Sequence, residues 1–80
     1  MRVDKFLKVS RIVKRRTVAN DMAAAGRVSI NGKRAKPGTE VAIGDIIEIG
    51  FGDKQTRIKV TDIKQSVRKE EAETLYQLLS

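Results

Sequence analysis

The sequence predicts an α+β fold, in which two short helices precede several short strands and a last helix. Apolar residues recur at helical spacing near both ends of the chain, and they alternate with polar residues between these regions. Turn-forming dipeptides divide the alternating region into short strands. Helices and strands segregated in this way are typical of an α+β domain. A chain of 80 residues suffices for one small domain, which we expect to span residues 1–80.

The first predicted helix covers residues 5–9. Asp4 has the side chain of an N-cap residue, whose oxygen can accept a hydrogen bond from the first turn. Phe6 and Leu7 supply the apolar contacts of this helix, and we expect Phe6 in the core.

A second helix is predicted after Thr17, another residue type that favours the N-cap position. Three apolar side chains then form a helical stripe at i, i+4 and i+7: Val18, Met22 and Ala25. Gly26 can adopt the left-handed conformation, so we expect the helix to end there.

A β-hairpin is predicted next. Val28 and Ile30 alternate with polar residues. Asn31-Gly32 follows and is a strong hairpin signal, because both residues tolerate a positive φ. Residues 33–35 can return as a short strand.

Two further strands and a terminal helix are predicted in the second half. Residues 46–49 and 56–63 have strand-like patterns, and residues 50–53 are interpreted as the turn between them. The expected core positions of the later strand are Ile58, Val60 and Ile63. The spacing i, i+3, i+4 and i+7 predicts a terminal amphipathic helix through Ala72, Leu75, Tyr76 and Leu79.

The excess positive charge lies entirely in the first half of the chain. Seventeen Lys and Arg against ten Asp and Glu give a net charge of +7. Residues 1–36 hold eleven basic and two acidic side chains, whereas residues 37–80 hold six basic and eight acidic ones. Clustering of this kind indicates one surface that binds a polyanion such as nucleic acid.

The composition also excludes classes of function. The chain has no Cys and no His, which excludes disulfides, Cys- or His-ligated metals and Ser-His or Cys-His nucleophiles. We therefore expect no enzymatic activity, no cofactor, no metal and no small-molecule substrate. No apolar run approaches the roughly 20 residues of a membrane span, so we expect a cytoplasmic protein without a membrane partner.

The sequence fits neither a phosphate-binding loop nor a DNA-binding helix-turn-helix well. The segment Gly50-Phe51-Gly52 lacks the third glycine of a phosphate-binding loop and is interpreted as a turn. A helix-turn-helix would need base-reading side chains on its second helix, but that helix offers only Asn20 and Asp21 in its body.

The three aromatic residues indicate how RNA would be bound. Phe6 and Tyr76 lie on apolar helix faces and are expected in the core. The chain therefore lacks exposed platforms on which bases could stack. Binding should rest on phosphates, 2′-hydroxyls and the shape of the RNA.

An ordered series of short motifs resembles a known RNA-binding module. The series comprises Arg2-Val3-Asp4-Lys5-Phe6-Leu7, Ser10-Arg11, Lys14-Arg15-Arg16-Thr17, Gly26-Arg27-Val28-Ser29-Ile30-Asn31-Gly32-Lys33 and Val41-Ala42-Ile43-Gly44-Asp45-Ile46-Ile47. It resembles the module named after ribosomal small-subunit protein S-four, also called the alpha-L motif, over residues 1–50. The opening is similar in particular to the heat-shock protein fifteen family. The short acidic C-terminal end is similar to the compact branch of that family, which lacks the basic extension of longer members.

The resemblance implies a fold and a role. Two N-terminal helices would pack on a small, bent, mainly antiparallel sheet, with residues 51–80 adding a strand and a short C-terminal helix. The protein would act in ribosome quality control, binding large ribosomal subunits obstructed by peptidyl-tRNA and contacting both rRNA and tRNA. It would support template-free C-terminal tailing of stalled chains, together with a ribosome-bound tailing factor.

The resemblance also implies the RNA-binding residues. In this sequence they are Arg2, Lys5, Lys8, Arg11, Arg15, Arg16 and Thr17 from the helical pair, with Asn31 and Lys33 from the hairpin. Asp4 would either orient Arg2 or Arg16 or cap the first helix. We expect a monomer. The alternatives are a general structured-RNA-binding module, acting in rRNA assembly or as an RNA chaperone, and an RNA-binding appendage of an RNA-modifying enzyme.

Overall fold

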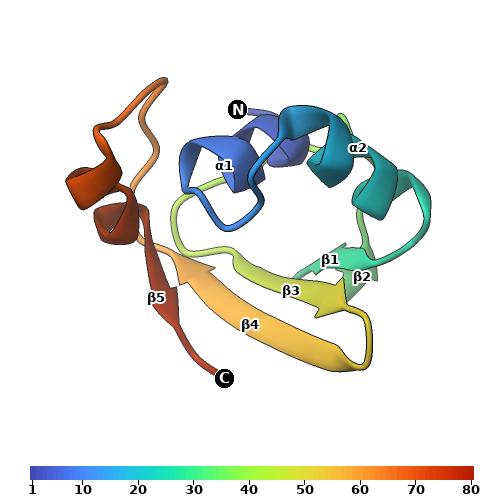
Figure 1. The fold of residues 1–80 in the computed structure, drawn as a ribbon. Coiled ribbons are helices and arrows are strands. Elements are labelled where there is room, and N and C mark those ends of the chain that lie inside the picture. Colours follow the sequence, from blue (N-terminus) through green and yellow to red (C-terminus); the bar gives the residue numbers. More distant parts are fainter.

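A computed structural model describes all 80 residues and confirms the α+β class. Helices α1 and α2 lie over one face of a five-stranded sheet (Figure 1). Neighbouring strands pair antiparallel throughout, in the order β2-β1-β3-β4-β5. The elements are α1 (Val3–Val9), α2 (Arg16–Ala24), β1 (Val28–Ile30), β2 (Lys33–Arg34), β3 (Ile46–Phe51), β4 (Lys54–Val60), the 3-10 helix η1 (Lys69–Leu75) and β5 (Tyr76–Leu78). None of the helices is long and apolar enough to cross a membrane.

The core lies between the helical pair and the inner face of the sheet. Cross-strand partners share a face, and alternation along β3 and β4 places Ile47, Ile49, Ile58 and Val60 inward. The largest side chains without solvent exposure are those of Phe6, Leu7, Ile47, Ile49, Ile58 and Leu75. Phe6 and Leu7 come from α1, so the first helix is anchored directly on the sheet.

Helix α1 begins at Val3, two residues earlier than an N-cap at Asp4 would place its start. The backbone amides of Val3 and Asp4 donate to the carbonyl oxygens of Thr39 and Pro37, at 2.8 and 3.4 Å. The Lys5 amide donates to Oδ1 of Asp4 at 2.8 Å. The first-turn amides therefore find their acceptors in the 37–39 loop and in Asp4 itself, and Asp4 lies inside the helix.

Helix α2 is present where it was predicted, but its start and its buried face differ from the prediction. It begins at Arg16 rather than after an N-cap at Thr17. The buried residues are Ala19 and Ala23, whereas Val18 of the predicted stripe is 44% exposed. Alanine side chains let the two helices approach closely, and this contact sets the orientation of α2 instead of its larger apolar residues.

The predicted turns are confirmed. Gly26 has φ +80 and follows α2 directly, in the left-handed conformation that ends many helices. Asn31 and Gly32 have φ 53 and 82 and join β1 to β2. The predicted turn at residues 50–53 is shorter in the structure, because β3 continues through Phe51 and pairs it with Lys54.

The predicted terminal helix is wrong in its second half. Residues 69–75 form the 3-10 helix η1, with Ala72 and Leu75 buried as expected. The chain then extends, and β5 pairs with β4 through Tyr76 opposite Val60 and Leu78 opposite Ile58. The free edge of β4 offers hydrogen bonds that a continued helix would leave unused.

The two leucines of the predicted helical stripe should therefore differ in their effect on stability. Leu75→Ala removes a fully buried side chain and should lower the free energy of unfolding by about 2–5 kcal/mol. Leu79→Ala changes a side chain that is 40% exposed and should cost less than about 1 kcal/mol. Urea unfolding followed by circular dichroism measures both. Equal losses would contradict the burial of η1 against the sheet.

Candidate nucleic-acid interface

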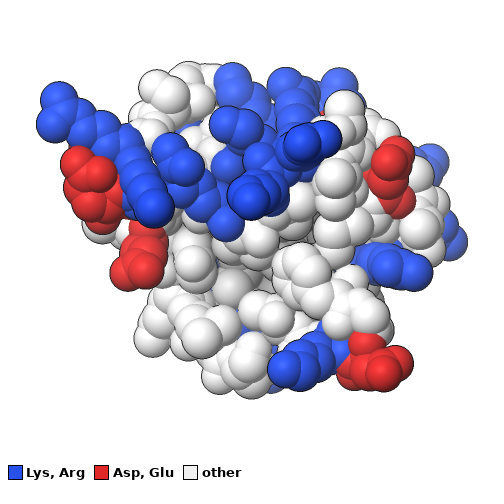
Figure 2. All heavy atoms as spheres, in the orientation of Figure 1, with Lys and Arg blue, Asp and Glu red and all other residues white.

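Basic side chains gather on the helical side of the molecule. In Figure 2 the Lys and Arg atoms form a nearly continuous band over α1 and α2, while acidic atoms lie mainly at its margins. Below the band, the surface around β5 is mostly uncharged in this view, and blue and red atoms lie together at the β3–β4 turn. The basic residues that cluster in the first half of the sequence thus also cluster on one side of the molecule, as required for binding an extended polyanion.

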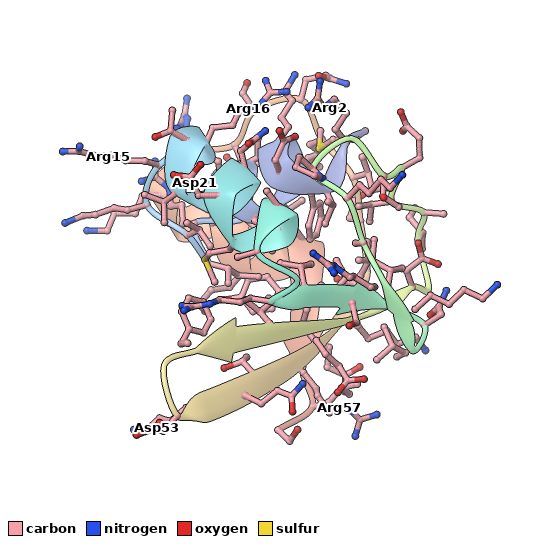
Figure 3. All side chains as sticks on the ribbon, turned by 90° about the vertical axis from the view of Figure 1, so that its right-hand side faces the viewer. Arg2, Arg15, Arg16, Asp21, Asp53 and Arg57 are labelled. Atoms are coloured by element: carbon pink, nitrogen blue, oxygen red, sulfur yellow. The ribbon has the colours of Figure 1, made fainter.

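One buried carboxylate organises two of these arginines. Asp4 is 2% exposed, and its Oδ2 accepts a hydrogen bond from Arg2 Nη2 at 3.1 Å. Its Oδ1 lies 3.5 Å from Arg16 Nη2. The side chains of Arg2 and Arg16 remain 48% and 47% exposed, so each guanidinium has donors left for a ligand. Figure 3 shows both arginines on the same side of the molecule.

The charge of Asp4 is stabilised by its neighbours. Burial raises the pKa of its carboxyl, but a hydrogen bond from Asn20 Nδ2, at 3.2 Å, lowers it, as does the bond from the Lys5 amide. The positive charges of Arg16 and Arg2 lower the pKa further, and the net result lies below the usual range. The carboxyl of Asp4 is therefore ionised at neutral pH.

Beside this carboxylate is a polar depression, which we call the Asp4 hollow. It measures about 350 Å³ and is lined by Arg2, Asp4, Arg16, Thr17, Asn20 and Asp21. It contains no hydrophobic residue. The guanidinium groups of Arg2 and Arg16 can donate to phosphate oxygens, and the carboxylate, amide and hydroxyl groups of the other lining residues suit ribose hydroxyls.

A second depression, which we call the basic groove, adjoins the first at Arg16. It measures about 290 Å³, and its lining includes Lys5, Lys8, Arg11 and Arg16 but no acidic residue. The far wall is the segment 65–67. Four cations around one depression form a strong site for phosphate groups.

The segment 65–67 was missed by sequence reasoning. Lys5 Nζ donates a hydrogen bond to Oε1 of Gln65, sixty residues away in the chain. Ser66 lines the same groove. Local sequence patterns carry no information about such a long-range contact.

A second residue, Asn20, was also missed as a site residue. It lies one helical turn after Arg16 and shares its face of α2, so helical spacing could have indicated it.

The structure brings most of the predicted residues together. Those that line the two adjoining depressions are Arg2, Lys5, Lys8, Arg11, Arg16 and Thr17. Arg15, the residue before α2, projects away from this group in Figure 3.

The two hairpin residues lie elsewhere. Asn31 is engaged within the fold, because its Nδ2 donates to Asp45 and its Oδ1 accepts from the Ile46 amide. Lys33 is exposed on β2. Neither residue lines the basic groove or the Asp4 hollow.

Comparison with known proteins shows the family to which the chain belongs. The S4 domain family matches residues 1–47. The RQC P-site tRNA stabilizing factor of Halalkalibacterium halodurans is 53% identical, over 98% of this chain and 89% of that protein. The protein of the same name from Streptococcus pneumoniae is 49% identical, over 100% of this chain and 91% of that protein. The structure resembles the trimeric structure of Vibrio cholerae Heat Shock Protein 15, with a TM-score of 0.92 and 36% identity over 100% of this chain and 82% of the other.

The match to the S4 domain family covers more than half of the chain, residues 1–47. These residues include α1, α2 and the hairpin after them, and thus the cations along the helices. The chain belongs to the S4 domain family, and within it to the group formed by the RQC P-site tRNA stabilizing factors. Its five-stranded sheet extends beyond the matched residues: β4 and β5 lie wholly after residue 47, and β3 continues past it.

The role of Asp4 predicts a specific pH dependence of stability. The folded state lowers the pKa of Asp4, so its stabilising contribution is present at neutral pH and is lost as the pH falls from about 4 through the folded-state pKa. Asp4→Asn should lower the free energy of unfolding at pH 7 by about 1–3 kcal/mol. Urea unfolding at several pH values measures the gap between the two proteins, which should narrow below about pH 4. A gap that stays constant would mean that packing, rather than charge, is lost.

Proposed function

We propose that this protein is a non-catalytic RNA-binding factor of ribosome quality control, which stabilises tRNA in the P site of the large ribosomal subunit. The observation that carries the proposal is the band of Lys and Arg over the helical pair, whose cations line the basic groove and, together with Asp4 and Asp21, the Asp4 hollow. Its relatives at about half sequence identity are named RQC P-site tRNA stabilizing factors, which supports the tRNA as partner.

The mechanism we propose is a clamp between two RNAs. rRNA and tRNA repel each other, and a thin layer of fixed cations between them lowers this repulsion. The adjoining depressions, joined at Arg16, offer two neighbouring places for phosphate groups. Two weak contacts made together raise the overall affinity through effective concentration, so a subunit that carries peptidyl-tRNA would be preferred over an empty one.

The finer steps of this role extend the same proposal. The obstructed large subunit would be the binding target, and the held peptidyl-tRNA would be the donor of the nascent chain during template-free tailing. A ribosome-bound tailing factor would bring aminoacyl-tRNA, while this protein only fixes the position of the P-site tRNA. We place the protein in the cytoplasm, where its ribosomal partners are.

Substitution of Arg16 gives the most direct test of the proposal, because Arg16 lines both the basic groove and the Asp4 hollow. Arg16→Ala should weaken binding to peptidyl-tRNA-bearing large subunits on the order of ten-fold, and it should reduce the slope of log K against log salt by about 1. Arg57→Ala is the matched control, since Arg57 is exposed on β4, on the opposite side of the molecule (Figure 3). Co-sedimentation across a salt series measures both.

Circular dichroism must show that Arg16→Ala is folded, and the structure supports this expectation. Asp4 keeps its bonds to Arg2, Asn20 and the Lys5 amide when Arg16 is removed. A folded Arg16→Ala protein that binds as tightly as the Arg57→Ala control would contradict the assignment of this surface.

The clamp also predicts a preference between ribosomal particles. The unmodified protein should co-sediment more strongly with large subunits that carry peptidyl-tRNA than with empty ones, and the difference should persist at moderate salt. Equal, salt-labile binding to both particles and to free tRNA would instead favour the general structured-RNA-binding alternative.

A further inference from the structure

The sheet extends beyond the helical layer that covers it. Along β3, inward-facing residues continue from Ile49, which is fully buried, to Phe51, which is 38% exposed. Along β5, Leu78 faces the same side as its partner Ile58 but is 64% exposed. In Figure 1 the β3–β4 hairpin and β5 reach well below the helices. Part of the inner apolar face is therefore open.

A depression lies where the helical layer ends, which we call the aromatic hollow. It measures about 580 Å³, the largest in the molecule. Its lining includes Arg11, Ile12, Phe51, Thr56, Glu73 and Tyr76. Two of the three aromatic residues of the chain thus share one open depression. The expectation that Tyr76 lies on a helix is wrong: it belongs to strand β5, where it is partly buried and packs against the core.

The aromatic hollow and the basic groove meet at one shared residue. Arg11 lines both depressions. Its backbone has φ 61, a left-handed conformation that is unfavourable for an arginine. The turn after α1 holds this strained conformation through the hydrogen bond from the Arg11 amide to the Lys8 carbonyl, at 3.0 Å. The residue that joins a phosphate-binding groove to an aromatic depression is therefore held in a costly conformation, which is common at functional sites.

We propose that the aromatic hollow receives one unstacked nucleobase of the RNA whose phosphates occupy the basic groove. This inference rests on the proposed RNA-binding function and adds a second component to it. A nucleotide joins an anionic phosphate to a flat, largely apolar ring. The basic groove suits the phosphate and the aromatic hollow suits the ring, and Arg11 lines both. Aromatic side chains stack on the face of any base, and an arginine guanidinium does the same.

The polar groups of the hollow favour a base over a phosphate. Glu73 lines the hollow and would repel a phosphate group, but its carboxylate can accept hydrogen bonds from the amino group of adenine or cytosine. Thr56 offers a hydroxyl at the opposite, strand side. The arrangement thus sorts the two parts of a nucleotide, with the phosphate on the groove side of Arg11 and the base on the sheet side.

The chain contains a convenient reporter for this test. Tyr76 is its only tyrosine, so incorporation of 3-fluorotyrosine gives a single ¹⁹F resonance located in the aromatic hollow. Two ribose-phosphate oligomers of equal length and charge serve as probes: one carries a single adenine among abasic residues, and the other is fully abasic. The adenine oligomer should bind on the order of ten-fold more tightly and should shift the resonance, whereas the abasic oligomer should bind without shifting it.

Variants locate the effect. Phe51→Ala should abolish the advantage of the adenine oligomer while leaving the affinity for the abasic oligomer unchanged, because Phe51 lies outside the basic groove. Arg57→Ala should leave the advantage intact, since Arg57 lines neither depression. An adenine advantage that survives Phe51→Ala would overturn the proposal.

Arg11→Gly tests the connection between the two depressions without endangering the fold. Glycine adopts φ 61 without strain, so the variant should be at least as stable as the unmodified protein. It should weaken the binding of both oligomers, because the residue shared by groove and hollow is gone. Unchanged binding of both oligomers would overturn the idea that phosphate and base are bound on the two sides of Arg11.

The remaining outcomes separate the two proposals. If both oligomers bind equally and the resonance stays in place, the hollow does not receive a base, whereas the proposed RNA-binding surface stands. If neither oligomer binds even at low salt, the proposed RNA-binding function fails, and the nucleobase site fails with it. If the resonance shifts with protein concentration in the absence of RNA, a second copy of the chain covers the hollow, and the nucleobase proposal is overturned.

Discussion

The arrangement of the helical pair depends on the buried carboxylate of Asp4. Helices of seven and nine residues are too short to be stable in isolation, so their positions are set by contacts. Asp4 supplies an acceptor for the first turn of α1, for Asn20 on α2 and for two guanidinium groups. Each of these arginines would be repelled by the dense positive charge around it. One fixed negative charge offsets part of that repulsion and keeps both guanidiniums at the surface, where a phosphate can reach them.

The two arginines at the borders of the depressions turn separate features into one surface. Arg16 is common to the Asp4 hollow and the basic groove, and Arg11 is common to the basic groove and the aromatic hollow. Arg11 lies in the segment between α1 and α2, whose Val13 is buried against the core, and Arg16 is the first residue of α2 directly after that segment. The attachment of this segment to the core contributes to binding as its charge does, because side chains that are already ordered lose little conformational entropy when a ligand binds.

The sequence predicted those features that local chemistry determines. The positive φ at Asn31-Gly32 and Gly26 follows from residue type, and the clustered cations follow from composition. The C-terminal segment was misjudged, since the apolar residues around Leu75 and Tyr76 fit helical spacing and strand alternation equally well, and only pairing with β4 decides between them. The contact of Lys5 with Gln65 could not be predicted, because nothing local in either segment refers to the other.

The two outer strands of the sheet are unusually short. Strand β2 has two residues, both basic, and β5 has three. A long free edge can recruit a strand from another chain, and short or charged edges resist this. The protein can therefore leave apolar side chains uncovered on its inner face with little tendency to polymerise. The short edges thus leave the aromatic hollow open, as the proposed nucleobase site requires, while offering little free strand edge on which another chain could pair.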